Sequence, residues 1–304
     1  MIQKDKLLKH KLFYYLNIES DQTKELFSLM IYSEAIDFIF RHVEEDIGLE
    51  DVAEYCHFSK YYFSRLFKEQ TGESVYGFIK RVRLEQSAFR LKVERERPIT
   101  EISADFGYSS SNFSSAFKLH YDVAPVVFRR GSFKQSVEHP FFHRENWQME
   151  SFEECDRKIQ VRTVPDYRVV YERRFGSYEG LKGQWDRFVK KYGAYITNDT
   201  VFLERTYDDP AVTREERCLS DICMSVGEDC SLESTAVIQG GTCIVYRFRG
   251  HAKHIYGAYQ TVFLVWLPRT RYVIDAYKSM FDVYHMVDSE TMYMEMDICV
   301  PVKG

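Results

Sequence analysis

The chain contains an internal duplication near its N-terminus that aligns without a gap. Residues 49–81 lie over residues 99–131, at an offset of 50 positions. The identical pairs are Ser59/Ser109, Phe63/Phe113, Ser64/Ser114, Phe67/Phe117, Lys68/Lys118 and Phe78/Phe128. A repeat of this length is one supersecondary unit used twice, so it restricts the architecture before any single helix or strand is considered.

Each copy of the repeat predicts two short helices separated by a tight turn. In the first copy, apolar residues at helical spacing predict a helix that begins near Leu49 and a second one over residues 59–71. In the second copy, Gly107 permits the tight turn before a helix over residues 110–121. Helices joined so closely must cross, which is the helix-turn-helix arrangement. Residues 74–93 contain no proline and predict one long helix that connects the two copies.

A set of positions in and around the second copy carries a family signature. These positions are Arg83 and Leu84, Ser87, Ile99, Ile102, Gly107 and Tyr108, Phe113, Phe117 and Lys118, and Ala124 and Pro125. Together they resemble the signature of the AraC/XylS transcription regulators. The resemblance covers residues 32–133 and implies an all-α domain of two helix-turn-helix units that binds double-stranded DNA.

The second half of the chain also repeats, more loosely. At an offset of 74, Gly176, Gly183 and Trp185 match Gly250, Gly257 and Tyr259, and at an offset of 76, residues 220–226 match residues 296–302. Each unit predicts a strand, a helix and then further strands. Two α+β units related by a pseudo-two-fold axis leave a cleft between them, which is a common place for a ligand.

Five segments give this half a resemblance to the GyrI-like effector-binding domains. They are residues 176–185, 207–226, 266–272, 281–284 and 296–303. The resemblance covers residues 156–304 and implies a site for a small-molecule effector. The predicted organisation is therefore multi-domain. An N-terminal helical extension over residues 1–31 precedes the DNA-binding domain, and a linker over residues 134–155 precedes the α+β domain.

The AraC/XylS resemblance implies that the second helix of each unit enters the major groove. The positions that would read bases are Lys60, Tyr61, Ser64 and Arg65 in the first unit and Ser110, Ser111, Asn112 and Ser115 in the second. The candidates for phosphate contacts are Lys68, Lys118, Arg129 and Arg130. Arg129 and Arg130 equally suit the C-terminus of a helix, where positive charge is favourable.

Arg65 is the strongest candidate for base recognition, because a guanidinium group can bond both O6 and N7 of guanine. An ion pair with Glu69, four residues later, is the alternative. In the family an arginine often stands where this chain has Ser115, and a short hydroxyl group discriminates bases less well. The first unit is therefore predicted to carry most of the base specificity, and the second to bind mainly the DNA backbone.

Aromatic and acidic side chains in the second half are the candidates for effector binding. The aromatic candidates are Trp185 and Tyr259 at matching positions, together with Trp266, Phe281 and Tyr284. A cationic aromatic ligand needs rings to stack on and a carboxylate to balance its charge. The resemblance places the ligand acid at Asp297, but Glu295 lies on the same strand face, and the two rank equally. Asp221 matches Asp297 in the first unit, which favours structural roles for both.

Bulk properties restrict the remaining function classes. A net charge of −5 argues against a protein that coats nucleic acid by bulk attraction. The seven cysteines have no metal-site spacing, and no nucleophile or phosphate-binding motif occurs. No cofactor, no metal site and no enzymatic activity are therefore expected. The alternatives for the second half are a small-molecule hydrolase and a protein-interaction module.

The expected partners are double-stranded DNA, a small-molecule effector and RNA polymerase, and the chain is expected to act as a monomer or a homodimer. No apolar run approaches the roughly 20 residues of a membrane span, so a cytoplasmic location without membrane contact is expected. The family resemblance favours activation of transcription. Residues 4–16 are amphipathic enough to form a dimer contact or a cap on the DNA-binding domain.

Overall fold

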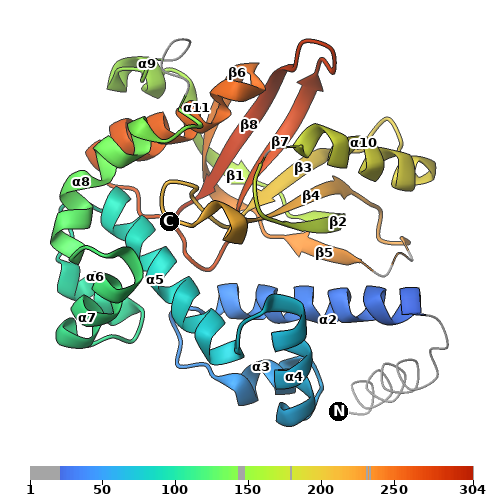
Figure 1. Ribbon diagram of the computed structural model, residues 1–304. Coiled ribbons are helices and arrows are strands. Elements are labelled where there is room, and N and C mark those ends of the chain that lie inside the picture. Colours follow the sequence, from blue (N-terminus) through green and yellow to red (C-terminus); the bar gives the residue numbers. More distant parts are fainter. Residues whose placement is uncertain (1–20, 143–147, 179, 231, 233, 304) are drawn as a thin grey trace. The chain divides into compact units, whose positions relative to one another are not determined.

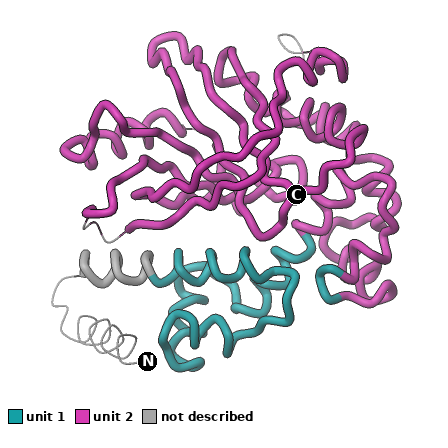
Figure 2. Tube along the Cα trace, turned by 180° about the vertical axis from the view of Figure 1, so that it is seen from behind, with its two compact units in different colours: residues 1–84, 105–107 teal, residues 85–104, 108–304 magenta. Residues whose placement is uncertain are grey.

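A computed structural model describes residues 21–142, 148–178, 180–230, 232 and 234–303 of the chain (Figure 1). The amphipathic segment of residues 4–16 lies outside the described residues. The chain divides into two compact units, residues 1–84 with 105–107 and residues 85–104 with 108–304 (Figure 2). None of the helices in the described ranges combines the length and the apolar character that a membrane span requires.

The first unit is helical. Its helices are α2 (Asp21–Arg41), α3 (Leu49–Tyr55), α4 (Lys60–Thr71) and the first part of α5 (Val75–Val93). Their apolar faces form the core, in which Ile36, Val52 and Phe63 are buried. Gly72 ends α4 with a φ of 72°, a left-handed conformation that a residue without a Cβ atom adopts at low cost.

The second helix-turn-helix unit reproduces the local geometry of the first. Helices α6 (Ile99–Asp105), α7 (Ser110–Tyr121) and α8 (Pro125–Glu138) begin at the offset of the sequence repeat from α3, α4 and α5. The left-handed residues repeat too, since His57 and Gly107 have φ values of 64° and 75°, and Gly72 and Asp122 have 72° and 61°. The predicted duplication is confirmed, and the predicted connecting helix is α5.

The α+β part is built on one antiparallel sheet of eight strands. In sheet order they are β1 (Ile159–Val164), β6 (Gly241–His251), β8 (Tyr293–Pro301), β7 (Met280–Val287), β3 (Phe202–Thr206), β4 (Leu219–Ser225), β2 (Tyr167–Phe175) and β5 (Thr235–Ile238). The order β6-β8-β7 mirrors β2-β4-β3, so a pseudo-two-fold axis passes between β3 and β7. The predicted pair of strand-helix-strand units is therefore confirmed.

The two faces of this sheet bury different residues. Helix α10 (Leu181–Tyr192) packs on β2 and β4, and α11 (Ile255–Thr261) packs on β6 and β8 on the same face (Figure 1). The opposite face has its own core, in which Leu203, Cys223 and Phe281 pack together. A short helix, α9 (Phe152–Asp156), lies at the end of the predicted linker. Because side chains alternate along a strand, neighbouring residues of β3, β7 and β8 belong to different cores.

Candidate functional site

The first recognition helix, α4, carries its predicted DNA-reading side chains away from the core. Lys60, Tyr61, Arg65 and Lys68 are exposed, and Ser64 is half-buried. Lys60 Nζ lies 2.8 Å from Glu50 Oε1, and the guanidinium carbon of Arg65 lies 5.7 Å from the centroid of the Tyr62 ring. Within the described residues Arg65 forms no ion pair with Glu69, and its side chain is exposed.

The second recognition helix, α7, presents a row of short polar side chains. Ser110, Ser111, Asn112, Ser115 and Lys118 are exposed, and the Ser109 hydroxyl group caps the helix by accepting a hydrogen bond from the Asn112 backbone N–H at 3.4 Å. On α8, Arg130 is exposed but Arg129 is half-buried. Burial lowers the pKa of Arg129, partly offset by the charges of Glu94 and Glu96. Of the two predicted phosphate-contact arginines, Arg130 is therefore the more accessible.

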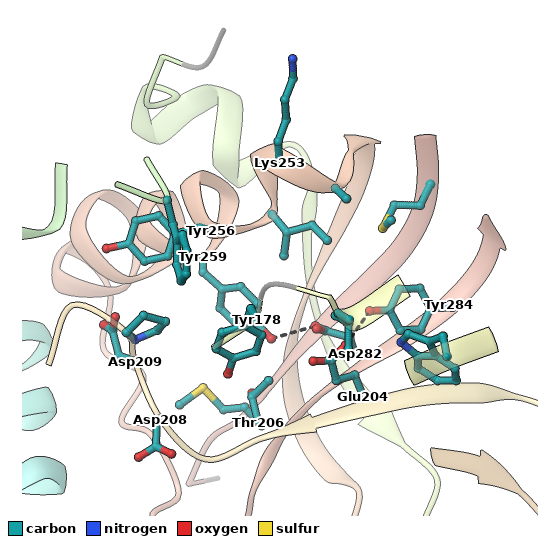
Figure 3. A pocket seen from close by; sticks show the side chains of 18 of the residues that line it. Tyr178, Glu204, Thr206, Asp208, Asp209, Lys253, Tyr256, Tyr259, Asp282 and Tyr284 are labelled. Atoms are coloured by element: carbon teal, nitrogen blue, oxygen red, sulfur yellow. Dashed lines mark hydrogen bonds between the residues drawn. The ribbon is translucent and has the colours of Figure 1, made fainter. Parts of the chain in front are cut away.

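A cavity of about 760 Å³ lies in the second compact unit. Its lining comes from strands β3, β7 and β8, from helices α10 and α11, and from α5. The aromatic side chains in this lining include Tyr178, Trp185, Tyr256, Tyr259 and Tyr284. Figure 3 shows several of these rings around two carboxyl groups, while the Lys253 side chain points away from them.

The two carboxyl groups belong to Glu204 and Asp282, which are directly opposite each other on β3 and β7. Each is only 3% exposed. Tyr284 Oη donates a hydrogen bond to Glu204 Oε2 at 3.0 Å, and Tyr259 Oη donates one to Asp282 Oδ1 at 2.8 Å (Figure 3). The pseudo-two-fold axis therefore places two acids side by side at the centre of the sheet.

This acidic pair binds protons more tightly than ordinary carboxyl groups. Burial raises the pKa of Glu204 to about 7, although the Tyr284 hydroxyl group and the charge of Arg174 act to lower it. Burial also raises the pKa of Asp282 well above its usual range, and the neighbouring Glu204 charge raises it further. Two adjacent carboxylates without a cation between them cannot both ionise at low cost. Burial and mutual repulsion therefore both disfavour the state in which the two carboxyl groups are ionised together.

The comparisons with known proteins agree with this architecture. Residues 52–131 match a helix-turn-helix domain, and residues 157–303 match the GyrI-like small molecule binding domain. The regulatory protein SoxS of Escherichia coli is 32% identical over 100 residues, which are 33% of this chain and 92% of SoxS. The chain belongs to the AraC/XylS family. Its second half is a GyrI-like small molecule binding domain.

Two further relatives of this AraC/XylS member also match about a third of the chain. The transcriptional regulator Rob of Salmonella typhimurium is 31% identical over 113 residues, which are 37% of each protein. The chain thus matches just over a third of the length of Rob. The solved C-terminal domain of AraT, a response regulator from Geobacillus stearothermophilus, is 36% identical and covers 33% of this chain and 84% of that domain, with a TM-score of 0.31.

The cavity of this AraC/XylS member contains three of the five predicted aromatic residues. Trp185, Tyr259 and Tyr284 line it. Trp266 is instead buried in the core, where its Nε1 donates a hydrogen bond to Asp156 Oδ1 at 2.8 Å. Phe281 lies in the core on the opposite face of the sheet. The structure thus separates the predicted set into a cavity group and a core group.

The structure places the two predicted ligand acids, Glu295 and Asp297, on the face of β8 that is opposite to the cavity. Met294 and Met296 pack toward the helices, so side-chain alternation turns the two acids the other way. Arg249 Nε lies 3.1 Å from Glu295 Oε2. Neither acid is among the described residues that line the cavity.

Asp297 and its counterpart Asp221 hold arginines on this opposite face. Arg247 Nε lies 2.5 Å from Asp297 Oδ1. In the first unit, Arg173 Nε lies 2.8 Å from Asp221 Oδ1, and Arg205 Nε lies 2.8 Å from Asp221 Oδ2. Arg173 and Arg247, which are 74 positions apart, are therefore matching partners of the two aspartates in the duplicated domain.

Sequence reasoning missed the acidic pair in the cavity. Asp282 lies in the FDVY segment, residues 281–284, and Glu204 lies in the FLERT segment, residues 202–206. The signal that could have found them is the period of two, which puts Asp282 on the same face as Tyr284. Once Tyr284 is assigned to the cavity, Asp282 and its cross-strand neighbour follow.

Proposed function

We propose that this protein is a transcription regulator that binds double-stranded DNA through its two helix-turn-helix units and an aromatic monocation through its GyrI-like domain. The observation that carries the ligand class is the pair of buried carboxyl groups, Glu204 and Asp282, inside an aromatic-lined cavity. A buried charge is costly unless a partner balances it. A monocation balances the single charge that the pair carries after it retains one proton.

The cavity also has the dimensions and the lining that such a ligand requires. Its volume of about 760 Å³ falls within the range of about 300–1,000 Å³ that is typical of sites for drug-sized molecules. The faces of Tyr178, Trp185 and Tyr256 supply negative electrostatic potential, which attracts an organic cation. Shape, ring faces and charge therefore favour the same class of ligand.

Calorimetric titration of the full chain with tetraphenylphosphonium tests this part of the proposal. We expect saturable binding, and none for the uncharged triphenylphosphine oxide, because only the cation balances the acidic pair. Glu295→Gln is the matched control, since it removes a carboxylate outside the cavity and should leave the affinity unchanged. Equal affinity for the cation and the uncharged compound would contradict the proposed ligand class.

The affinity for this cation should rise with pH. The ligand favours ionised Glu204, whose pKa is raised to about 7, so protonation at lower pH competes with the cation. From pH 8 to pH 6 the affinity should fall about tenfold, following the ionised fraction of one group. Tetraphenylphosphonium does not titrate, so the change reports on the protein. A flat profile in calorimetry over this range would show that the pair takes no part in binding.

The exposed residues of α4 and α7 support the proposed DNA contacts. Lys60, Tyr61 and Arg65 are exposed on α4, whereas α7 offers mainly serine hydroxyl groups. Arginine gives bidentate contacts to guanine, and hydroxyl groups give weaker and less selective ones. The proposal therefore assigns most of the base specificity to α4.

Arg65→Ala should weaken binding to a duplex that the protein itself selects from a random-sequence pool. Loss of a bidentate base contact costs about 1–3 kcal/mol, which is roughly a 5- to 150-fold loss of affinity. Fluorescence anisotropy with the selected duplex and with single-base variants measures both affinity and preference. Ser115→Ala is the control on α7, and its effect should stay within about threefold. Unchanged base preference in Arg65→Ala would refute the assignment.

The same proposal covers the contact with RNA polymerase, the effect on transcription and the location in the cell. The matched relatives SoxS and Rob are named as a regulatory protein and a transcriptional regulator, which supports a role in transcription rather than catalysis. We therefore propose contact with RNA polymerase, activation of transcription and a cytoplasmic location. Steady turnover of an ester by the full chain, lost in Glu204→Gln, would instead favour the hydrolase alternative.

A further inference from the structure

The helix that connects the two DNA-reading units also forms part of the cavity wall. Glu85, Gln86 and Phe89 of α5 line the cavity together with residues of the GyrI-like domain. The Phe89 ring packs edge-on against Phe263, with centroids 5.1 Å apart and an interplanar angle of 83°. Phe89 and Val93 belong to the same buried core as the α11 side of the sheet. A ligand in the cavity therefore meets the connecting helix directly.

Lys92, one turn further along α5, reaches two other parts of this wall. Its side chain is 1% exposed, and its ammonium group donates hydrogen bonds to Asp209 Oδ2 and, at 2.6 Å, to Gln260 Oε1. Both Asp209 and Gln260 line the cavity. Burial lowers the pKa of Lys92, while the Asp209 charge raises it. A buried ammonium group with these two partners fixes their positions, because moving Asp209 leaves a buried charge unbalanced and moving Gln260 leaves a buried N–H donor without its acceptor.

Asp209 in turn organises the segment of residues 207–213. Its Oδ1 accepts a hydrogen bond from the Ala211 backbone N–H at 2.9 Å, and its carbonyl oxygen accepts from the N–H groups of Val212 and Thr213, both at 2.8 Å. Gln86 Nε2 donates to the Tyr207 carbonyl oxygen at 3.0 Å. The side chains of α5 thus hold this wall segment at two places.

Helix α8 of the second helix-turn-helix unit holds the same wall from another side. Gln135 Nε2 donates to the Ala211 carbonyl oxygen at 2.9 Å. Tyr256 Oη, on α11, donates to the Ser136 carbonyl oxygen at 3.1 Å. Two elements of the DNA-binding module therefore contact the two cavity walls that Lys92 joins.

We propose that the ligand site is composite, with α5 as one of its walls, and that Lys92 is the positioning residue through which ligand occupancy acts on the second helix-turn-helix unit. The inference rests on the proposed function in that the cavity must hold a ligand. Any ligand that shifts residues 207–213 or α11 changes the energy of the Lys92 contacts. By thermodynamic reciprocity, DNA binding by the second unit then changes the affinity for the ligand.

Hydrogen exchange tests the composite wall without any ligand. In the full chain, Lys92→Met should accelerate amide exchange in residues 207–213 and 255–261. Asp209 in the first segment and Gln260 in the second both lose their hydrogen bond with Lys92. Lys134→Met is the matched control, since it removes one positive charge from an exposed position on α8. If Lys92→Met does not fold, the double variant Lys92→Met/Asp209→Leu removes both buried charges and takes its place. Its readout is exchange in residues 255–261 alone, because Asp209→Leu also removes the acceptor of the Ala211 N–H. Unchanged exchange in the two segments overturns the inference.

Coupling between the two sites is measured at concentrations of tetraphenylphosphonium that saturate each variant. In the wild-type chain the probe should change the dissociation constant for the selected duplex by at least about fivefold, a typical allosteric effect. In Lys92→Met the change should fall below about twofold. Retention of the wild-type change in the variant overturns the role of Lys92. Absence of probe binding to the wild-type chain contradicts the proposed ligand class instead, and hydrogen exchange still decides the composite wall.

Discussion

Glu204→Gln is expected to abolish the binding of an aromatic cation and, at neutral pH, to make the fold more stable. Glutamine keeps the size of the side chain, and its carbonyl oxygen still accepts the hydrogen bond from Tyr284 that Glu204 Oε2 accepts at 3.0 Å. Unlike glutamate, glutamine does not ionise, so it carries no charge that burial destabilises. The same change therefore removes the attraction for the ligand and the cost of ionising a buried acid.

The pH dependence of stability follows from the direction of the shift. The pKa of Glu204 rises from 4.5 to about 7 on folding, so between these values the folded chain binds more protons than the unfolded chain. Stability should accordingly fall as pH rises through this range and remain lower above about pH 7. A shift of this size corresponds to about 3 kcal/mol at one group. Glu204→Gln should not show this loss of stability, because glutamine does not ionise.

Urea unfolding of the full chain at pH 5 and pH 8 measures this effect, with Trp fluorescence as the signal. The difference in unfolding free energy between wild type and Glu204→Gln should grow in favour of the variant between pH 5 and pH 8. Asp282→Asn should behave in the same direction, because burial raises the pKa of Asp282 as well. Glu295→Gln is the control, and its pH dependence should match wild type. A variant that is less stable than wild type at pH 8 would show that Glu204 has stabilising partners in the folded chain.

The architecture could be predicted from the sequence because each duplicated unit carries its own periodic signal. Gly107 marked the turn of the second helix-turn-helix unit, and the same left-handed conformation occurs at His57 in the first. In the second half, matching glycines and strand patterns located the two strand-helix-strand units and their pseudo-two-fold axis. Because the same local structure occurs twice, the sequence pattern of one copy supports the prediction for the other.

The acidic pair could not be predicted in the same way, because Glu204 and Arg205 are adjacent charged residues that are both buried. Charged residues side by side ordinarily indicate a solvated segment. In β3 the two faces of the sheet are both covered, and each charge finds its own partners: Tyr284 for Glu204 and Asp221 for Arg205. This placement depends on tertiary contacts between strands far apart in the sequence.

The contribution of α5 to the cavity wall could not be predicted from the sequence either, because it also depends on tertiary contacts. Residues 87–93 of this helix are buried on all sides, including Arg90 and Lys92. A helix pattern shows which faces are apolar, but a basic residue on such a helix is more often exposed, as in a DNA-binding surface. Asp209 and Gln260, which are 117 and 168 residues away in the sequence, make the buried site for Lys92. No local pattern contains that information.

The duplicated α+β domain contains two matching aspartates, Asp221 and Asp297, whose arginine partners differ in exposure. Asp221 is fully buried, and the side chains of its partners Arg173 and Arg205 are 4% and 7% exposed. Asp297 is 2% exposed, but its partners Arg162 and Arg247 are 43% and 42% exposed. Removing the aspartate charge therefore leaves two buried guanidinium groups in the first unit and two hydrated ones in the second.

Asp221→Asn is expected to destabilise the chain far more than Asp297→Asn. Breaking a buried pair leaves an uncompensated charge and costs about 3–5 kcal/mol, whereas a pair whose cation reaches water contributes at most about 1 kcal/mol. Urea unfolding of the two variants, followed by Trp fluorescence, measures the difference. Calorimetry with tetraphenylphosphonium separates structure from binding, since Asp297→Asn should keep the wild-type affinity if the cavity acids are Glu204 and Asp282. Loss of cation binding in Asp297→Asn, with stability unchanged, would show that the acid that binds the cation is Asp297 on β8.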